Sequence, residues 1–239
     1  MSDGMVREEL TGDDAALSAF RLADSFLPDG SHTASYGLEQ FVQADRVRDA
    51  EDLGDLLDTY LRRQIAPADL VALRAAHGAA VNGDLDGVLA ADRRLAAVTL
   101  TAEFRDSSTA AGERLLTLQR EIQAASLLNE YATRLDAGDT PGTHPAVLGA
   151  VTGLAGVDER EACLLCCHGF VTGLLGVAQR LLSLGHTDAQ RLLADCRPAM
   201  VAAVDDSATR TLDDMTPFTP LVDVVSAEHE RADRRLFVS

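Results

Sequence analysis

The densest group of metal-binding residue types is Cys163-x-x-Cys166-Cys167-His168. Thiolates and an imidazole are ligands that nickel and zinc accept. No second Cys or His pair lies nearby in the sequence to complete a tetrahedral site, and Leu164, three before Cys167, excludes a haem-attachment motif. At helical spacing the three cysteines share one face of an apolar helix, where free Cys is a common small core residue. We favour core packing and keep metal binding through these four residues as the alternative.

Two further patterns contain histidine. His229-Glu230-x-x-Asp233 resembles half of a zinc-protease motif, but Asp233 replaces the second His and no further ligand follows. We therefore interpret it as part of a solvated, charged tail. The remaining histidines outside the cysteine group are dispersed along the chain, and each is expected to be structural or to lie on the surface: His32, His77, His144 and His186.

Glu39 is a charged residue in an otherwise apolar stretch that continues through Phe41 and Val42. A carboxylate on such a helix either pairs with an Arg or meets a partner protein. Periodicity alone favours pairing and leaves both alternatives open.

Signatures of catalysis are missing. All 21 cationic residues are Arg, so a Walker A loop, a Schiff-base lysine and a Ser-x-x-Lys dyad are excluded. The sequence has neither G-x-G-x-x-G nor G-x-S-x-G. We expect no enzymatic activity.

The charge of the chain limits its partners. Of 239 residues, 38 are acidic, giving a formal net charge of −17, which argues against binding to nucleic acid or to an anionic membrane. Asp outnumbers Glu 26 to 12, a composition that suits a surface hydrated in concentrated salt and suggests a halophilic source. The clustered cysteines and an acidic N-terminus without an apolar segment predict a reducing, cytoplasmic location.

The elements that position these residues are predicted to be helices. Apolar residues recur at spacings of three and four, as in Leu53–Leu61 and Leu115–Tyr131. The uncharged segments 140–157 and 162–179 are short for membrane spans and contain Pro or Gly, so we interpret them as buried core helices.

Helix breaks follow from Pro, Gly and capping residues. The first helix is expected over 14–26; Asp49 should cap the helix that starts at Ala50, Pro67 and Pro145 should each open a helix, and Gly185 should end one. The fold class is all-α: a single compact bundle of about ten helices. We expect a disordered acidic N-terminus (1–12), a helical domain (13–211) and a tail (212–239) that orders on partner binding.

Four segments, in the same order along the chain, resemble the UreF family of urease accessory proteins. They are LPDGSHTASYGLE (27–39), FRD with GERLL (104–106 and 112–116), RLLSLGHTDAQ (180–190), and SAEHER with RLFVS (226–231 and 235–239). The sequence departs from the family pattern at His32, Ser183, His186 and Ala189, which affects local contacts.

The resemblance implies an all-α, usually homodimeric chaperone without catalytic activity. Such a protein binds UreD (also called UreH), recruits the GTPase UreG, and helps the assembly insert nickel into apo-urease. The assembled complex would handle the nickel, with no cofactor bound tightly by this chain. The alternative function is a nickel-carrying metallochaperone that uses the Cys163–His168 group.

The same resemblance implies roles for particular residues. Glu39 and Arg180 are expected to contact or regulate the GTPase, and Arg105 to be a structural or interface residue. The tail residues expected to bind UreD, or to help form the docking surface for UreG, are His229, Glu230, Arg231, Arg235, Leu236, Phe237 and Ser239.

Overall fold

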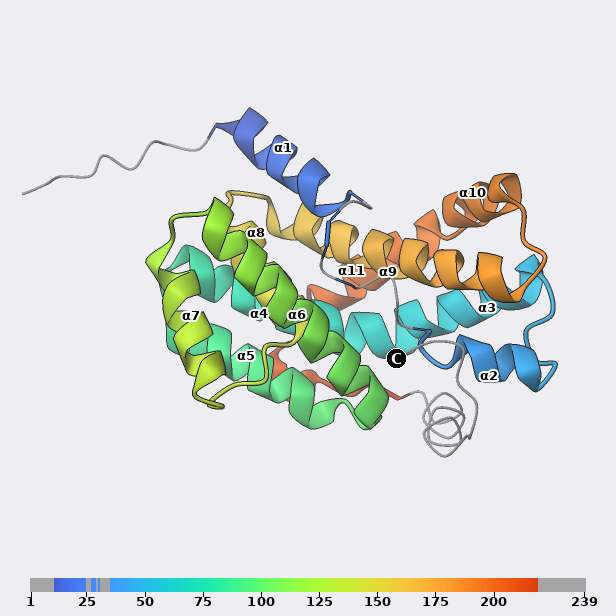
Figure 1. Cartoon of the computed structure of the whole chain (residues 1–239), viewed down its shortest axis with the longest axis horizontal. Helices are drawn as coiled ribbons and strands as arrows, with labels where there is room; N and C mark the ends of the chain where they lie inside the picture. Colours follow the sequence, from blue (N-terminus) through green and yellow to red (C-terminus); the bar gives the residue numbers. More distant parts are fainter. Residues whose placement is uncertain (1–10, 25–26, 29, 31–34, 219–239) are drawn as a thin grey trace, which may run out of the picture.

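Helices make up all the regular secondary structure in the computed structural model, which describes residues 11–24, 27, 28, 30 and 35–218 (Figure 1). The predicted all-α class is confirmed. The elements are α1 (Gly12–Leu22), α2 (Leu38–Gln43), α3 (Ala50–Tyr60), the π-helix η2 (Leu61–Asp69), α4 (Leu70–Val81), α5 (Leu85–Val98), α6 (Ala102–Ile122), α7 (Ser126–Asp136), α8 (His144–Leu154), α9 (Glu159–Leu181), α10 (His186–Asp195), α11 (Arg197–Ser207) and the 3-10 turn η3 (Leu212–Asp214).

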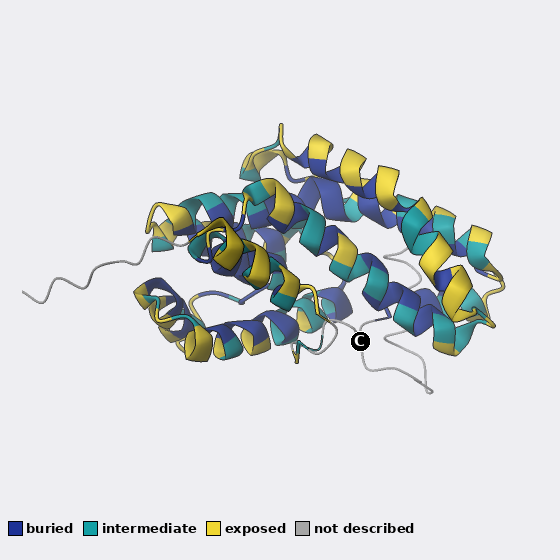
Figure 2. Ribbon diagram, turned by 90° about the horizontal axis from the view of Figure 1, so that it is seen from above, coloured by how far each residue is buried: buried dark blue, intermediate teal, exposed yellow. Residues whose placement is uncertain are grey.

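The core is built around α8, which is buried continuously from Pro145 to Thr152. Gly149 has no side chain where α8 crosses α4, and a Cβ there would lie 2.3 Å from the carbonyl oxygen of Leu73. The missing side chain therefore allows the two helix backbones to pack directly against each other. Figure 2 shows buried residues along the inward faces of the helices and exposed residues along the outside.

The two uncharged segments both form helices with large buried faces. The second becomes α9, the one described helix that is long and apolar enough to cross a membrane by length and composition. However, 56% of its most apolar 18-residue window is buried against the rest of the protein. Burial of that kind is typical of a core helix.

Pro67 does not open a helix, contrary to the expectation from its sequence. It lies inside η2, within a helical stretch that runs without a break from Ala50 to Val81. There the backbone widens to π-type bonding, as in the bond from the Leu70 N–H to the Ile65 carbonyl five residues earlier. A wider turn accommodates a residue without an N–H, so the helix continues through the proline.

Other expected boundaries are partly right. Asp49 caps α3 by accepting from the N–H groups of Glu51 and Asp52, and Pro145 lies in the first turn of α8. Gly185 does not end a helix; α9 ends at Leu181 and Gly185 is the N-cap of α10.

The first helix starts and ends earlier than expected, at Gly12 and Leu22. Its start is set by a reciprocal capping box, in which Thr11 accepts from the Asp14 N–H and the Asp14 carboxylate accepts from the Thr11 N–H.

The described start of the predicted tail, residues 212–218, packs against the body. Met215 is buried in a small apolar cluster with Ala68, Val71 and Leu95, and Leu212 packs against it. Residues 219–239 lie outside the described part.

Candidate partner-binding sites and the central cavity

Asp92 holds the loop that leads into α8. This carboxylate is fully buried on α5 and accepts four hydrogen bonds of 2.6–2.7 Å. The donors are the hydroxyl of Thr140, the N–H of Gly142, and both the N–H and hydroxyl of Thr143. A buried carboxylate with this many donors is well compensated for its loss of water. The loop, and with it the start of α8, is fixed relative to α5.

Helix α6 packs against the same loop at Gly112. A Cβ on this residue would lie 2.0 Å from the Gly142 carbonyl oxygen, so only glycine permits the observed approach. One turn earlier, the Ser108 hydroxyl accepts from the His144 N–H at 3.1 Å. Gly112 belongs to one of the four segments that resemble UreF, and its role here is close backbone packing.

Next to this loop lies a cavity of about 90 Å³ between η2, α6, α8 and α9. Polar groups on its lining come from Gln64, Asp69, Arg105, His144 and Cys166. Its apolar wall includes the edge-packed rings of Tyr36, Phe104 and Phe170, with Tyr36 centred 5.1 Å from each of the other two.

Asp69 is the unusual group in this cavity. Its Oδ2 atom is buried and receives no hydrogen bond from the described residues. Burial raises the pKa of Asp69 to about 7, although a hydrogen bond from Gln64 and the nearby His144 partly oppose this. Asp69 therefore exchanges a proton near neutral pH. Sequence reasoning missed Asp69, although a signal was present, because it is the one carboxylate in the otherwise apolar run Ile65–Leu73.

Arg105 lies at the edge of the same cavity, in the first turns of α6. Its Nη1 donates to the carbonyl oxygens of Thr99 and Leu100 at 2.6 and 2.7 Å. These bonds hold the connection between α5 and α6, so the geometry supports the structural half of its expected role.

The cysteine group is divided between the interior and the surface. Cys163, Cys166 and Cys167 are buried on α9, whereas His168 is exposed. Burial raises the pKa of Cys163 and Cys167 to about 12 and that of Cys166 as well, so these thiols are protonated near neutral pH. No group of three potential metal ligands occurs among the described residues. This arrangement favours core packing over the metal hypothesis.

Glu39 and Arg180 lie in contrasting environments. Glu39, in the first turn of α2, is only 1% exposed and its Oε1 accepts from the Gln43 side chain at 3.1 Å. Arg180 is exposed in the last turn of α9, where its Nε donates to the Gly176 carbonyl. Arg180 is therefore accessible to another protein, whereas Glu39 would act through the position of α2.

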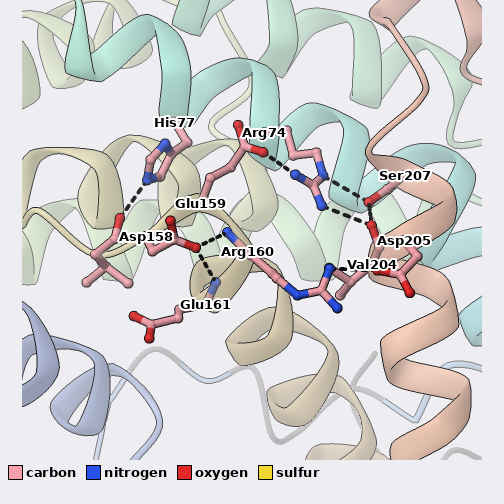
Figure 3. A network of polar contacts seen from close by, with 10 residues as sticks. Arg74, His77, Asp158, Glu159, Arg160, Glu161, Val204, Asp205 and Ser207 are labelled. Carbon is pink, nitrogen blue, oxygen red and sulfur yellow. Dashed lines mark hydrogen bonds and ion pairs between the residues drawn. The ribbon is translucent and has the colours of Figure 1, made fainter.

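Sequence reasoning also missed the polar network that joins α4, α9 and α11 (Figure 3). Arg74 forms an ion pair with Glu159 and donates to the Ser207 hydroxyl and the Val204 carbonyl at 3.0 and 2.9 Å. Nearby, the His77 ring contacts the Val157 carbonyl oxygen at 2.9 Å. The network fixes the N-terminal end of α9, the helix that carries the three buried cysteines.

The predicted partner-binding residues of the tail, 229–239, lie outside the described residues, as does His32. Their roles stay predictions.

Comparison with known proteins identifies the chain at the level of a family. The family model described as UreF matches residues 47–197, from the approach to α3 to the start of α11. The chain belongs to the UreF family. That match includes η2, the Asp92 loop, the cavity wall on α8 and the whole of α9.

Three UreF relatives show how far the similarity extends. The urease accessory protein UreF of Trichodesmium erythraeum (strain IMS101) is 34% identical over 93% of this chain and 96% of its own length. UreF 1 of Brucella melitensis is 31% identical over 93% of the chain and 92% of its own length. UreF of Yersinia enterocolitica (serotype O:8) is 31% identical over 92% of this chain and 96% of its own length.

Proposed function

We propose that this chain is a non-catalytic scaffold for urease maturation. It binds a UreD/UreH-type protein, recruits a UreG-type GTPase and presents the assembly to apo-urease, into which nickel is inserted. The observation that carries this proposal is the 31–34% identity to urease accessory proteins over 92–93% of the chain. The nickel ion is the cargo of the assembly, and the chain itself acts in the cytoplasm as a homodimer with no tightly bound cofactor.

The arrangement of the described residues is compatible with that role. Two groups of buried polar side chains hold helices and loops together, the networks around Asp92 and Arg74. Arg180 is exposed at the end of α9 and is therefore accessible to a partner. A rigid body with accessible contact residues is what a scaffold requires.

The test is co-expression with the UreD- and UreG-type proteins of the same genome, followed by light scattering during size exclusion. Molar KCl should be present, because a net charge of −17 opposes folding in dilute buffer. We expect a complex of the three proteins. A chain that elutes alone while correctly folded would overturn the scaffold function.

Site variants sharpen this test. Arg180→Ala should weaken UreG recruitment, while Arg48→Ala, an exposed arginine at the approach to α3, should leave it unchanged. Deletion of residues 228–239 should abolish the complex with UreD and preserve helicity. If Arg180→Ala and Arg48→Ala behave alike, Arg180 has no specific role in recruitment.

A further inference from the structure

Large exposed apolar side chains gather at one end of the molecule. Leu17 on α1 is 64% exposed, Val81 at the end of α4 is 60% exposed, and Ile122 at the end of α6 is 51% exposed. All three line a single groove. Isolated exposed apolar residues are common on proteins, whereas a group from three separate helices around one depression indicates an interaction surface.

The groove lies between α1 and the ends of α4, α6 and α8. Leu154 contributes to its lining from α8, and Leu127 from the start of α7. The hydrogen bond of 2.9 Å from Arg21 to Gln119 joins α1 to α6 at one side. In Figure 1 α1 lies along the upper edge of the molecule, above the last turns of α6. We call this surface, defined by Leu17, Val81, Ile122, Leu127 and Leu154, the α1 groove.

Charge distinguishes among the molecules that could fill the α1 groove. Two carboxylates, Asp14 and Glu130, are exposed on its lining and one cation, Arg21, lies there as well, so the lining carries a net negative charge. A second copy of the chain carries the same net charge of −17 and would meet this acidic rim with like charge, so we expect the proposed homodimer to form through another face. A positively charged partner would be attracted to the same rim.

We propose that the α1 groove binds an amphipathic helix of a partner protein, with Arg or Lys residues flanking an apolar face. Apolar residues of that helix, spaced three and four apart, would cover Leu17, Val81 and Ile122, and its basic flank would face Asp14 and Glu130. The proposal rests on the scaffold function and specifies the chemistry of one contact within it.

The experiment measures binding of the full chain to the UreD-type and UreG-type proteins separately. Leu17→Asp and Val81→Asp place a charge in the groove; Leu100→Asp is the matched control, because Leu100 is 72% exposed and lies outside it. We expect each groove variant to weaken one of the two complexes by about tenfold or more, and the control by less than about twofold. Unfolding in urea, followed by circular dichroism, checks that all three variants fold equally well.

A charge-matched pair tests the acidic rim. Glu130→Gln should weaken the same complex by about threefold, and this difference should shrink as KCl is raised. Glu113→Gln, an exposed residue of α6 outside the groove, should have no effect.

Each remaining outcome overturns a defined statement. Unchanged binding by Leu17→Asp and Val81→Asp would overturn the groove proposal and leave the scaffold function intact. A change confined to self-association of the isolated chain would assign the groove to a second copy. Lower stability of both groove variants than of Leu100→Asp would show that the chain covers the groove itself. If the wild-type chain binds neither protein, the scaffold function fails, and the groove proposal fails with it.

Discussion

The backbone N–H of Phe218 donates a hydrogen bond of 3.0 Å to the carbonyl oxygen of Arg63. In a regular α-helix that carbonyl would accept from the residue four positions later, which is Pro67 and has no N–H. The proline therefore removes the α-helical donor to this carbonyl, which accepts a hydrogen bond from the chain after η3. Pro67, which was predicted to start a helix, lies inside one, and Arg63, four residues before it, provides the attachment point for the segment after η3.

This attachment predicts different effects for two neighbouring residues. Met215→Ala should lower the free energy of unfolding by about 2–3 kcal/mol, because its side chain is buried against Ala68, Val71 and Leu95. Phe218→Ala should change it by less than about 0.5 kcal/mol, because the exposed residue attaches through its backbone. Urea unfolding in molar KCl measures both. Equal effects would show that the segment is not packed as described.

Two glycines in helices should respond to alanine with opposite signs. Gly112→Ala should destabilise the protein by about 1–3 kcal/mol, because the new Cβ would collide with the Gly142 carbonyl and separate α6 from the loop. Gly78→Ala, in α4 with open space around it, should stabilise by about 0.5–1 kcal/mol through helix propensity. Thermal and urea unfolding of the two variants provide the measurement. Stabilisation by Gly112→Ala would contradict the close packing.

Loss of the Asp92 charge should be costly. Asp92→Asn replaces an acceptor of four hydrogen bonds with a group that carries two donors of its own, so at least one buried donor loses its partner. We expect destabilisation of about 3 kcal/mol. Asp55→Asn, an exposed position on α3, should stay within about 0.5 kcal/mol of wild type. Similar values for the two variants would show that Asp92 does not hold the loop before α8.

Asp69 predicts a dependence of stability on pH. Its pKa is about 7 in the folded protein, well above the ordinary value of 3.8, so the folded chain retains a proton that the unfolded chain releases. Stability should therefore fall as pH rises from about 4 to about 7, and then level off. Asp69→Asn should remove this fall and gain roughly 2 kcal/mol over wild type at pH 8 relative to pH 4.5, allowing for the partial exposure of the side chain.

The measurement for Asp69 is the difference in unfolding free energy between variant and wild type at several pH values. Taking the difference cancels the carboxylates and histidines that both proteins share. His144, Arg105 and Cys166 line the same cavity and are unchanged in the variant. A difference that is constant with pH would show that Asp69 is ionised throughout.

The thiols should be unreactive while the protein is folded. Their pKa values are raised by burial, and the thiolate is the reactive form. We expect a disulfide reagent at pH 8 to label the folded chain about 100-fold more slowly than the chain unfolded in urea, where all four cysteines become accessible. Rapid labelling of the folded protein would show that the thiols are accessible, and Cys163, Cys166 and Cys167 would again be candidate metal ligands.

Much of the fold could be predicted because it depends on local rules. The spacing of Leu53–Leu61 predicted a helix with one buried face, and all of these residues except Leu61 are found in α3. The Asp49 cap and the first-turn Pro145 were also predicted correctly, since capping and proline geometry involve residues close together in the sequence.

The cavity depends on residues far apart in the chain. Asp69, Arg105 and His144 come from three separate elements, and no local pattern indicates that they line one space. Likewise, Gly112 was recognised only as part of a resemblance, and its reason became visible when Gly142 was found against it.

The sequence by itself determined the helical class, the family, the absence of lysine and the acidic surface, because these follow from composition, periodicity and motifs. Tertiary structure alone decided that Pro67 sits inside a helix, that Glu39 is buried while Arg180 is exposed, and that three helices present Leu17, Val81 and Ile122 to one groove. Burial, pKa and surface shape are set by contacts between distant segments, and those contacts exist only once the chain has packed.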